Sequence, residues 1–207
     1  MEKTRCYIVG AGDFCESVLP EKSDYIIAAD AGYTALISRG IHPDVVIGDF
    51  DSLGAVPDHP NAIQSSAEKD DTDMMLAVKF GLLLGYTHFF INGGLGGRLD
   101  HTYSNIQTMA YLTDHGATGR LCNNETCITA IKNDKYSFSS DEAVTGKKIA
   151  VFCHDKTAKG VTLKGLKYSL ENATLTNNNP TGISNEFTGV DASVEVKHGV
   201  LIIVWDN

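Results

Sequence analysis

Short apolar runs alternate with longer segments of helical periodicity in the first half of the chain. Each of the four apolar runs is followed by a glycine, an aspartate or an asparagine; they cover residues 6–9, 25–29, 45–47 and 88–91. Short continuous apolar runs bounded by turn residues are typical of strands that are buried on both faces of a parallel sheet. We therefore predict four parallel strands in this half of the chain.

Two further segments carry apolar residues at helical spacing. Residues 72–86 have apolar side chains at positions 75, 76, 78, 82 and 83, and residues 101–115 have them at positions 106, 109, 110 and 112. Gly116 is typical of the residue that ends a helix. The alternation of strands and helices predicts an α/β domain over residues 1–122, with a mostly parallel, Rossmann-like sheet.

The pattern changes after residue 122, where long helical segments disappear. Short β-rich runs take their place, at residues 126–131, 148–152, 161–163, 173–176, 192–196 and 200–205. Lys197-His198-Gly199 is typical of a tight turn between the last two runs. We therefore expect a second, all-β domain over residues 123–207, built as a small sandwich.

Composition and charge narrow the class of protein. Hydrophobic residues make up 43% of the chain and charged residues 21%, as in ordinary globular proteins. The formal charge of −9 speaks against the basic surface that a nucleic-acid-binding protein needs. No apolar run approaches the roughly 20 residues of a membrane-spanning helix, and no signal-peptide core is present. We expect a cytoplasmic protein with neither a nucleic acid nor a membrane as partner.

The five cysteines are odd in number, and their spacing matches neither a disulfide framework nor a paired CxxC zinc site. We therefore expect free thiols, as is usual in the reducing cytoplasm.

The negative charge is concentrated in one stretch, because residues 44–73 hold eight acids and one base. Asp49-Phe50-Asp51-Ser52 directly follows the third apolar run, and loops at the carboxyl ends of parallel strands form ligand crevices. Two carboxylates at i and i+2 on such a loop suit Mg²⁺, which leaves positions for water and substrate phosphate. A plain turn stabilised by Asp and Ser side chains is the alternative.

Residues 69–73, Lys-Asp-Asp-Thr-Asp, open the first helical segment. Capping of the helix explains one or two of the acidic residues. It does not require three aspartates in four positions, which repel one another unless a cation lies among them. Both a helix cap and a metal or phosphate site fit this segment.

A glycine-rich stretch, Gly93-Gly94-Leu95-Gly96-Gly97, joins the fourth run to the second helical segment. It is followed directly by Arg98-Leu99-Asp100-His101. Backbone N–H groups of such a turn can approach phosphate at the helix N-terminus. The stretch matches neither the P-loop nor GxGxxG. Arg98 can clamp phosphate oxygens and Asp100 can add a metal ligand, whereas the alternative is a flexible loop with an exposed ion pair. Together with Asp30, at the end of the second run, these features predict Mg²⁺-assisted phosphoryl transfer.

In combination, these motifs resemble those of the thiamine pyrophosphokinase (thiamine diphosphokinase) family. The matching segments occur in the family's order along nearly the whole chain, at residues 29–32, 48–52, 69–73, 94–101, 165–168 and 182–186. The resemblance implies Mg²⁺-dependent transfer of the diphosphoryl group of ATP to the hydroxyl group of thiamine, which yields thiamine diphosphate and AMP. It also implies a homodimer with active sites at the subunit interface.

The same resemblance implies roles for individual residues. The implied metal ligands are Asp49, Asp51, Asp73 and Asp100, and the implied catalytic residues are Asp70, Asp73 and Arg98. Binding of ATP and its phosphates falls to Asp30, Lys69, Thr72, Gly94, Gly96, Gly97, Arg98 and His101. Thiamine would meet Tyr168, Ser184 and Asn185, contributed by the β domain of the other subunit.

Two other classes of function stay open. A haloacid-dehalogenase-like phosphatase also places Asp-x-Asp after a strand. It needs a second acidic pair well downstream with a lysine between, whereas Asp70-Asp71 follows Asp51 by only 19 residues. A non-enzymatic regulator that binds nucleotide or thiamine would keep the glycine-rich stretch but could lose the metal-binding acids, and all of them are present.

Overall fold

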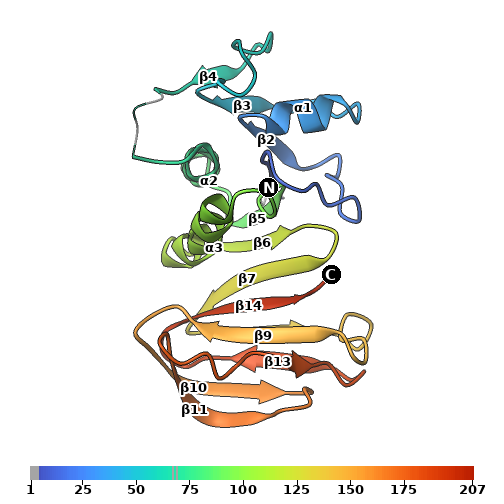
Figure 1. Cartoon of the computed structure of the whole chain (residues 1–207), viewed down its shortest axis with the longest axis vertical. Coiled ribbons are helices and arrows are strands. Elements are labelled where there is room, and N and C mark those ends of the chain that lie inside the picture. The colour runs from blue at the N-terminus through green and yellow to red at the C-terminus, as the bar shows by residue number, and fades with distance from the viewer. Residues whose placement is uncertain (1–4, 67, 69) are drawn as a thin grey trace.

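The N-terminal half of the chain forms a parallel sheet (Figure 1). The computed structural model describes residues 5–66, 68 and 70–207. In that part the strands of this sheet are β1 (Cys6–Val9), β2 (Tyr25–Ala29), β3 (Val45–Gly48), β4 (Ala62–Gln64), β5 (His88–Asn92) and β6 (Thr118–Cys122). They lie in the order β6-β5-β1-β2-β3-β4, and all neighbours are parallel. The four predicted strands are confirmed as β1, β2, β3 and β5.

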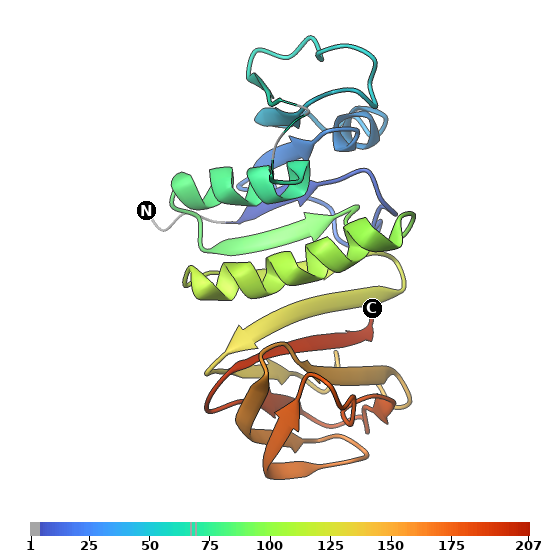
Figure 2. The same ribbon diagram turned by 60° about the vertical axis from the view of Figure 1, so that its left-hand side comes forward.

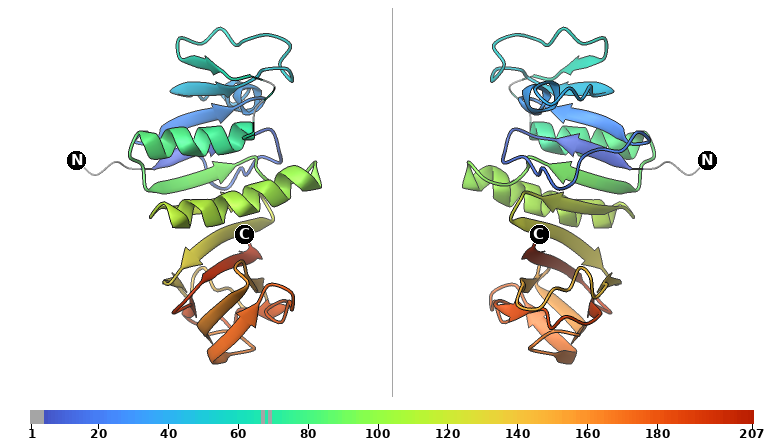
Figure 3. Two further views of the ribbon diagram at one scale, coloured as in Figure 1. Left: turned by 90° about the vertical axis from the view of Figure 1, so that its left-hand side faces the viewer. Right: turned by 90° about the vertical axis from the view of Figure 1, so that its right-hand side faces the viewer.

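Two long helices cover one face of this sheet. They are α2 (Asp73–Leu83) and α3 (Leu99–Asp114), which confirm the two helical segments expected from the sequence and lie side by side (Figure 2). The short helix α1 (Gly32–Ile37) packs against β1 and β2 from the opposite face (Figure 3). In the described part of the chain, no helix has the length and hydropathy needed to cross a membrane.

Three elements of this half were not expected from the sequence, for local reasons. Helix α1 has six residues, too few to show a helical period. Strand β4 lies at the edge of the sheet and is half-exposed or exposed throughout. Strand β6 contains Gly119 and Arg120, which interrupt the apolar run that would have revealed it.

The large sheet continues without a break beyond residue 122. Strand β7 (Thr126–Lys132) pairs antiparallel with β6, and β14 (Val200–Asp206), β9 (Lys148–Cys153) and β12 (Asn185–Glu186) follow, which makes ten strands in the described residues. A second sheet contains β11 (Leu170–Thr176), β10 (Thr157–Lys164), β13 (Ala192–Glu195) and β8 (Lys135–Phe138) in that order. Residues 123–207 are all described and contain no helix, so the all-β content expected there is confirmed.

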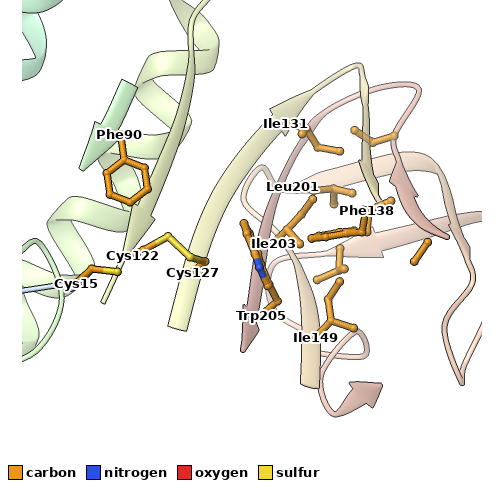
Figure 4. Close-up of a cluster of buried hydrophobic side chains, with 14 of the residues drawn as sticks. Cys15, Phe90, Cys122, Cys127, Ile131, Phe138, Ile149, Leu201, Ile203 and Trp205 are labelled. Atoms are coloured by element: carbon orange, nitrogen blue, oxygen red, sulfur yellow. A yellow bond between two sulfur atoms is a disulfide. The ribbon is translucent and has the colours of Figure 1, made fainter. Parts of the chain in front are cut away.

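The two sheets pack around a shared cluster of buried side chains. Phe138 of the second sheet and Trp205 of the first lie in it, with ring centroids 5.3 Å apart (Figure 4). The chain passes from one sheet to the other at Lys197-His198-Gly199, because β13 belongs to the second sheet and β14 to the first. This segment therefore connects the two sheets and does not close a hairpin, contrary to the expected tight turn.

The expectation that all cysteines are free thiols is wrong for two of them, because Cys122 and Cys127 form a disulfide (Figure 4). They are direct partners across the antiparallel pair β6–β7, with Cα atoms 4.2 Å apart. A hairpin that places two cysteines opposite each other at its closed end brings them within bonding reach. Rules based on disulfide frameworks and CxxC motifs do not predict a disulfide of this kind. Cys6, Cys15 and Cys153 are free and buried.

A buried asparagine joins β5 to the segment that follows β1. Asn92 is completely buried; its Oδ1 accepts a hydrogen bond from the backbone N–H of Cys15 at 2.7 Å. Its Nδ2 donates to the Cys15 carbonyl at 3.0 Å and to the Tyr7 hydroxyl at 2.7 Å. Burial raises the pKa of Tyr7 to about 12, so this hydroxyl stays protonated at neutral pH and donates to the Val18 carbonyl at 2.6 Å.

We expect Asn92→Ala to lower the free energy of unfolding by about 2–4 kcal/mol, because it removes these bonds and leaves buried polar groups of Cys15 without partners. Urea unfolding followed by circular dichroism measures the change. The exposed Asn178, replaced by alanine, is the control and should change the free energy of unfolding by no more than about 0.5 kcal/mol. An equally small loss for Asn92→Ala would contradict the structural role of the network.

Candidate active site at the carboxyl ends of the parallel strands

A cavity of about 430 Å³ lies where the strand order of the parallel sheet reverses. From β1 the sheet extends to β2, β3 and β4 on one side and to β5 and β6 on the other. Loops at the carboxyl ends of β1 and β5 therefore diverge and leave a crevice, which is the usual ligand position in such sheets. Residues 10–12 after β1 and glycines of residues 93–97 after β5 line the cavity, together with Asp30, Thr72, Asp73, Arg98, His101 and Asn105.

The two glycine-rich loops touch each other through their backbones. The N–H of Gly12 donates to the Gly93 carbonyl at 2.6 Å, and the N–H of Asp13 donates to the Leu95 carbonyl at 2.8 Å. A Cβ at position 12 would lie 2.3 Å from the Leu95 oxygen, so only glycine permits this approach. The sequence identified residues 10–12 only as the end of a strand. Their glycine content after the first parallel strand was a signal that could have placed them in the site.

Three carboxylates gather beside this cavity, at the ends of two neighbouring strands. Asp30 follows β2, and Asp49 and Asp51 follow β3, which is the parallel neighbour of β2. One oxygen of each lies within 4.8 Å of the other two. Between the two aspartates of the β3 loop, Phe50 is buried and has a φ of 64°, so its anchored ring fixes the turn. Asp30 also has a positive φ, of 47°.

The donor set of this cluster fits a Mg²⁺ ion. Within the described residues, Oδ1 of Asp30 is buried and has no hydrogen-bond partner. A buried carboxylate oxygen without a hydrogen-bond partner costs folding free energy. A cation would stabilise this oxygen and would also relieve the mutual repulsion of the three acids. Carboxylate oxygens are the ligands that Mg²⁺ prefers, usually with water and substrate phosphate in the remaining positions.

Two of the four expected metal ligands lie outside this cluster. Asp73 is the first residue of α2, lines the cavity and accepts a hydrogen bond from the Ser65 hydroxyl at 3.5 Å. Asp100 forms an exposed ion pair with Arg98 at 2.6 Å, the pair that the alternative interpretation of this segment includes. The guanidinium of Arg98 lowers the pKa of Asp100 below its ordinary value.

The start of α2 confirms the expected helix cap and places Asp73 at the cavity. Thr72 is the N-cap, and its hydroxyl accepts a hydrogen bond from the N–H of Met75 at 3.2 Å. Asp71 forms an ion pair with Lys79 at 2.6 Å, which leaves Asp73 facing the cavity. Asp70 is exposed and does not line the cavity. Lys69 lies outside the described residues.

The three expected thiamine-binding residues do not line this cavity. Tyr168 is 59% exposed. Ser184 is exposed and has a φ of 62°, in the left-handed region that non-glycine residues rarely adopt. Asn185 is buried, and its side-chain amide bonds to the main chain of Tyr168.

Two family models match the chain in succession. The model described as "Thiamin pyrophosphokinase, catalytic domain" matches residues 17–119, which contain the three-carboxylate cluster and the second glycine-rich loop. The model described as "Thiamin pyrophosphokinase, vitamin B1 binding domain" matches residues 135–201, which contain Tyr168, Ser184 and Asn185.

Individual relatives agree with the family models. The chain is 28% identical over 201 residues to a thiamine pyrophosphokinase of Bacillus subtilis, covering 91% of this chain and 93% of that protein. It is 25% identical over 177 residues to thiamin pyrophosphokinase 1 of Caenorhabditis elegans, covering 81% and 73%. The crystal structure of thiamine pyrophosphokinase from B. subtilis superimposes with a TM-score of 0.84 at 27% identity, over 99% of both chains. A thiamin pyrophosphokinase family protein from Enterococcus faecalis gives 0.83 at 27% identity, again over 99% of both.

Proposed function

The chain belongs to the thiamin pyrophosphokinase family of kinase-type transferases. We propose that it transfers the diphosphoryl group of ATP to the hydroxyl group of thiamine, and that this reaction takes place in the cavity. The products are thiamine diphosphate and AMP. The observation that carries this proposal is the meeting of two glycine-rich loops and a three-carboxylate cluster at one cavity. Such a site combines a cradle for phosphates with a binding place for their counter-ion.

We infer that the phosphates of ATP lie against the loop of residues 93–97, at the N-terminus of α3. The helix dipole and the backbone N–H groups there favour negative charge. Arg98 would exchange its exposed partner Asp100 for phosphate oxygens, which it can bind through two parallel hydrogen bonds. Thr72, His101 and Lys69 complete the set of ATP-binding residues that we propose. In this reading the parallel half of the sheet serves as a Rossmann-like nucleotide-binding unit.

Asp30, Asp49 and Asp51 would hold Mg²⁺, whereas Asp73 and Asp100, the other two ligands that the resemblance implies, lie outside this cluster. When bound, the ion supplies neutralisation of negative charge on the phosphate oxygens. The unpartnered Asp30 oxygen supports this assignment. It adds Asp30 to the ligands that the resemblance implies.

In the proposed reaction, the thiamine hydroxyl oxygen forms a bond to the β-phosphorus of ATP. The bond between that phosphorus and the oxygen shared with the α-phosphate breaks, and AMP leaves with this oxygen. Asp73 is the best-placed acceptor for the hydroxyl proton, because it lines the cavity and lies outside the three-carboxylate cluster. Asp70 is exposed and outside the cavity lining, which makes it a weaker candidate.

The thiamine site would combine two subunits of a homodimer. Tyr168, Ser184 and Asn185 do not line the cavity of their own chain, so we propose that they serve the cavity of a partner subunit. The exposed apolar side chains of Tyr168 and Ile183, 59% and 57% exposed, support a contact surface there. Residues 1–122 would then form the catalytic domain and residues 123–207 a sandwich domain for thiamine binding and dimerisation.

We propose a cytoplasmic location, because ATP, the proposed donor, is held there. The disulfide between Cys122 and Cys127 is unusual for that compartment.

An assay of AMP release tests the proposal and its alternatives together. Protein incubated with ATP, Mg²⁺ and thiamine should release AMP and thiamine diphosphate in equal amounts. Omission of thiamine or addition of EDTA should abolish the release. A phosphatase would instead liberate inorganic phosphate without thiamine, and a binding regulator would release nothing; either result would overturn the proposed reaction.

A further inference from the structure

The buried side chain of Asn185 is directed at the main chain of Tyr168. We propose that Asn185 is a positioning residue, whose amide fixes the main chain of Tyr168 so that the exposed Tyr168 ring is held ready for thiamine. This inference rests on the proposed function, in which Tyr168 receives the substrate. It assigns Asn185 a role other than the thiamine contact that the family resemblance implies.

The hydrogen bonds of the Asn185 side chain define this role. Its Oδ1 accepts from the N–H of Tyr168 at 2.9 Å, and its Nδ2 donates to the carbonyl of Tyr168 at 2.7 Å. Oδ1 also accepts from the N–H of Glu186 at 2.9 Å. Asn185 is 4% exposed. Its Oδ1 already accepts two hydrogen bonds and its Nδ2 donates one, so only one N–H remains. Such a group has little left to offer a ligand.

The amide takes the place of a peptide group in an antiparallel ladder. Leu166 and Phe187 form an antiparallel bridge, and the N–H of Lys167 donates to the Glu186 carbonyl at 2.9 Å. One position further, the Asn185 side chain both accepts from and donates to Tyr168, as a facing residue does in such a pair. The main chain itself turns at Ser184, where φ is 62°, so the side chain extends the pairing by one residue.

The Asn185 amide therefore fixes the main chain of Tyr168, while the Tyr168 side chain stays accessible to a ligand. Tyr168 is 59% exposed, and the ammonium group of Lys167 lies 5.6 Å from the centroid of its ring. Lys167 is itself held by Glu186 at 3.1 Å. Thiamine is an aromatic cation, and such cations are attracted to the faces of aromatic rings. A ring on a fixed main chain loses less conformational freedom when the ligand binds, which strengthens binding.

A double-mutant cycle between Asn185 and Tyr168 tests the proposal. We expect Asn185→Ala and Tyr168→Ala each to raise KM for thiamine by about tenfold or more, with KM for ATP unchanged. The double variant should be no worse than Tyr168→Ala, because Asn185 acts only through Tyr168. Asn185→Asp keeps the acceptor but loses the donor to the Tyr168 carbonyl, so it should also raise KM for thiamine; it provides a second variant if the alanine variant does not fold.

Thr188→Val is the matched control. The Thr188 hydroxyl donates to the Gly165 carbonyl at 2.9 Å and so links the same two segments without reaching Tyr168. We expect this variant to leave KM for thiamine unchanged, which separates positioning of Tyr168 from general loosening of the segments.

Two results would overturn the positioning role. One is an unchanged KM for thiamine in Asn185→Ala, and the other is a further rise when this change is added to Tyr168→Ala. Calorimetric Kd values for thiamine repeat the cycle without turnover. Wild-type protein that binds thiamine but releases no AMP would overturn the proposed reaction alone, whereas wild-type protein that does not bind thiamine would overturn both proposals.

Discussion

Asp30→Asn is expected to lower kcat for AMP release by about 100- to 1000-fold, the usual cost of removing one preorganised electrostatic group. The Asp30 oxygen that has no partner in the described structure is the group a bound cation would stabilise most. Its replacement by an amide removes one negative charge and one ligand but keeps the side-chain shape. The fold should therefore persist, and the Tm without Mg²⁺ should stay equal or rise, because repulsion from Asp49 and Asp51 is relieved.

Thermal unfolding with and without Mg²⁺ gives a readout that is independent of turnover. Mg²⁺ should raise the Tm of the wild-type protein by mass action, and this rise should shrink or vanish in Asp30→Asn. Asp58→Asn, at an exposed acid in the same part of the chain, is the control and should keep both the Tm rise and the turnover. Asp73→Asn should lower kcat and yet keep the Tm rise. Near-wild-type kcat in Asp30→Asn would contradict the assignment of the cluster.

Gly12→Ala is expected to raise KM for ATP by about 100-fold, which corresponds to a loss of about 2.8 kcal/mol in binding free energy. A Cβ at this position would lie 2.3 Å from the Leu95 oxygen and 2.8 Å from the Gly93 oxygen. Both obstacles are backbone atoms, so the two glycine-rich loops would have to separate. Steady-state kinetics with varied ATP and saturating thiamine measures the effect.

Gly40→Ala is the control for the loss of a glycine as such. Gly40 has a φ of 69° but nothing within 4 Å of the added Cβ. We expect a loss of about 1 kcal/mol in the free energy of unfolding from backbone strain, with KM for ATP unchanged. An unchanged KM for ATP in Gly12→Ala would show that the contact between the loops does not shape the nucleotide site.

Local patterns predicted those elements that are long or strongly apolar. The helices α2 and α3 were recognisable because eleven and sixteen residues are long enough to show helical spacing. The expected apolar stripe matches the buried face of α3, but in α2 only Val78 of the expected stripe is buried. The short helix α1 and the edge strand β4 were not, because six and three residues carry too little pattern. The same limit applies to the disulfide, since pairing of Cys122 with Cys127 depends on which residues face each other across β6 and β7.

The candidate site divides in the same way. Carboxylates and glycines at the ends of apolar runs were visible in the sequence, because turn residues after buried strands stand out locally. The sequence also predicted that they share one crevice, but not which carboxylates come within ligand distance of one another. Asp30 joins Asp49 and Asp51 because β2 and β3 are neighbours, whereas Asp100 is paired with Arg98, the residue that precedes its own helix.

The sequence by itself determined the type of each long element, the all-β content after residue 122, and the residue types and family motifs that predict phosphoryl transfer. The tertiary structure alone decided which carboxylates meet, that residues 10–12 lie against residues 93–95, that one sheet runs through both halves, and that the Asn185 amide holds Tyr168. The physical reason is the range of the interactions. Periodicity and turn chemistry act between residues near in sequence, whereas strand order and side-chain pairing join residues far apart in it.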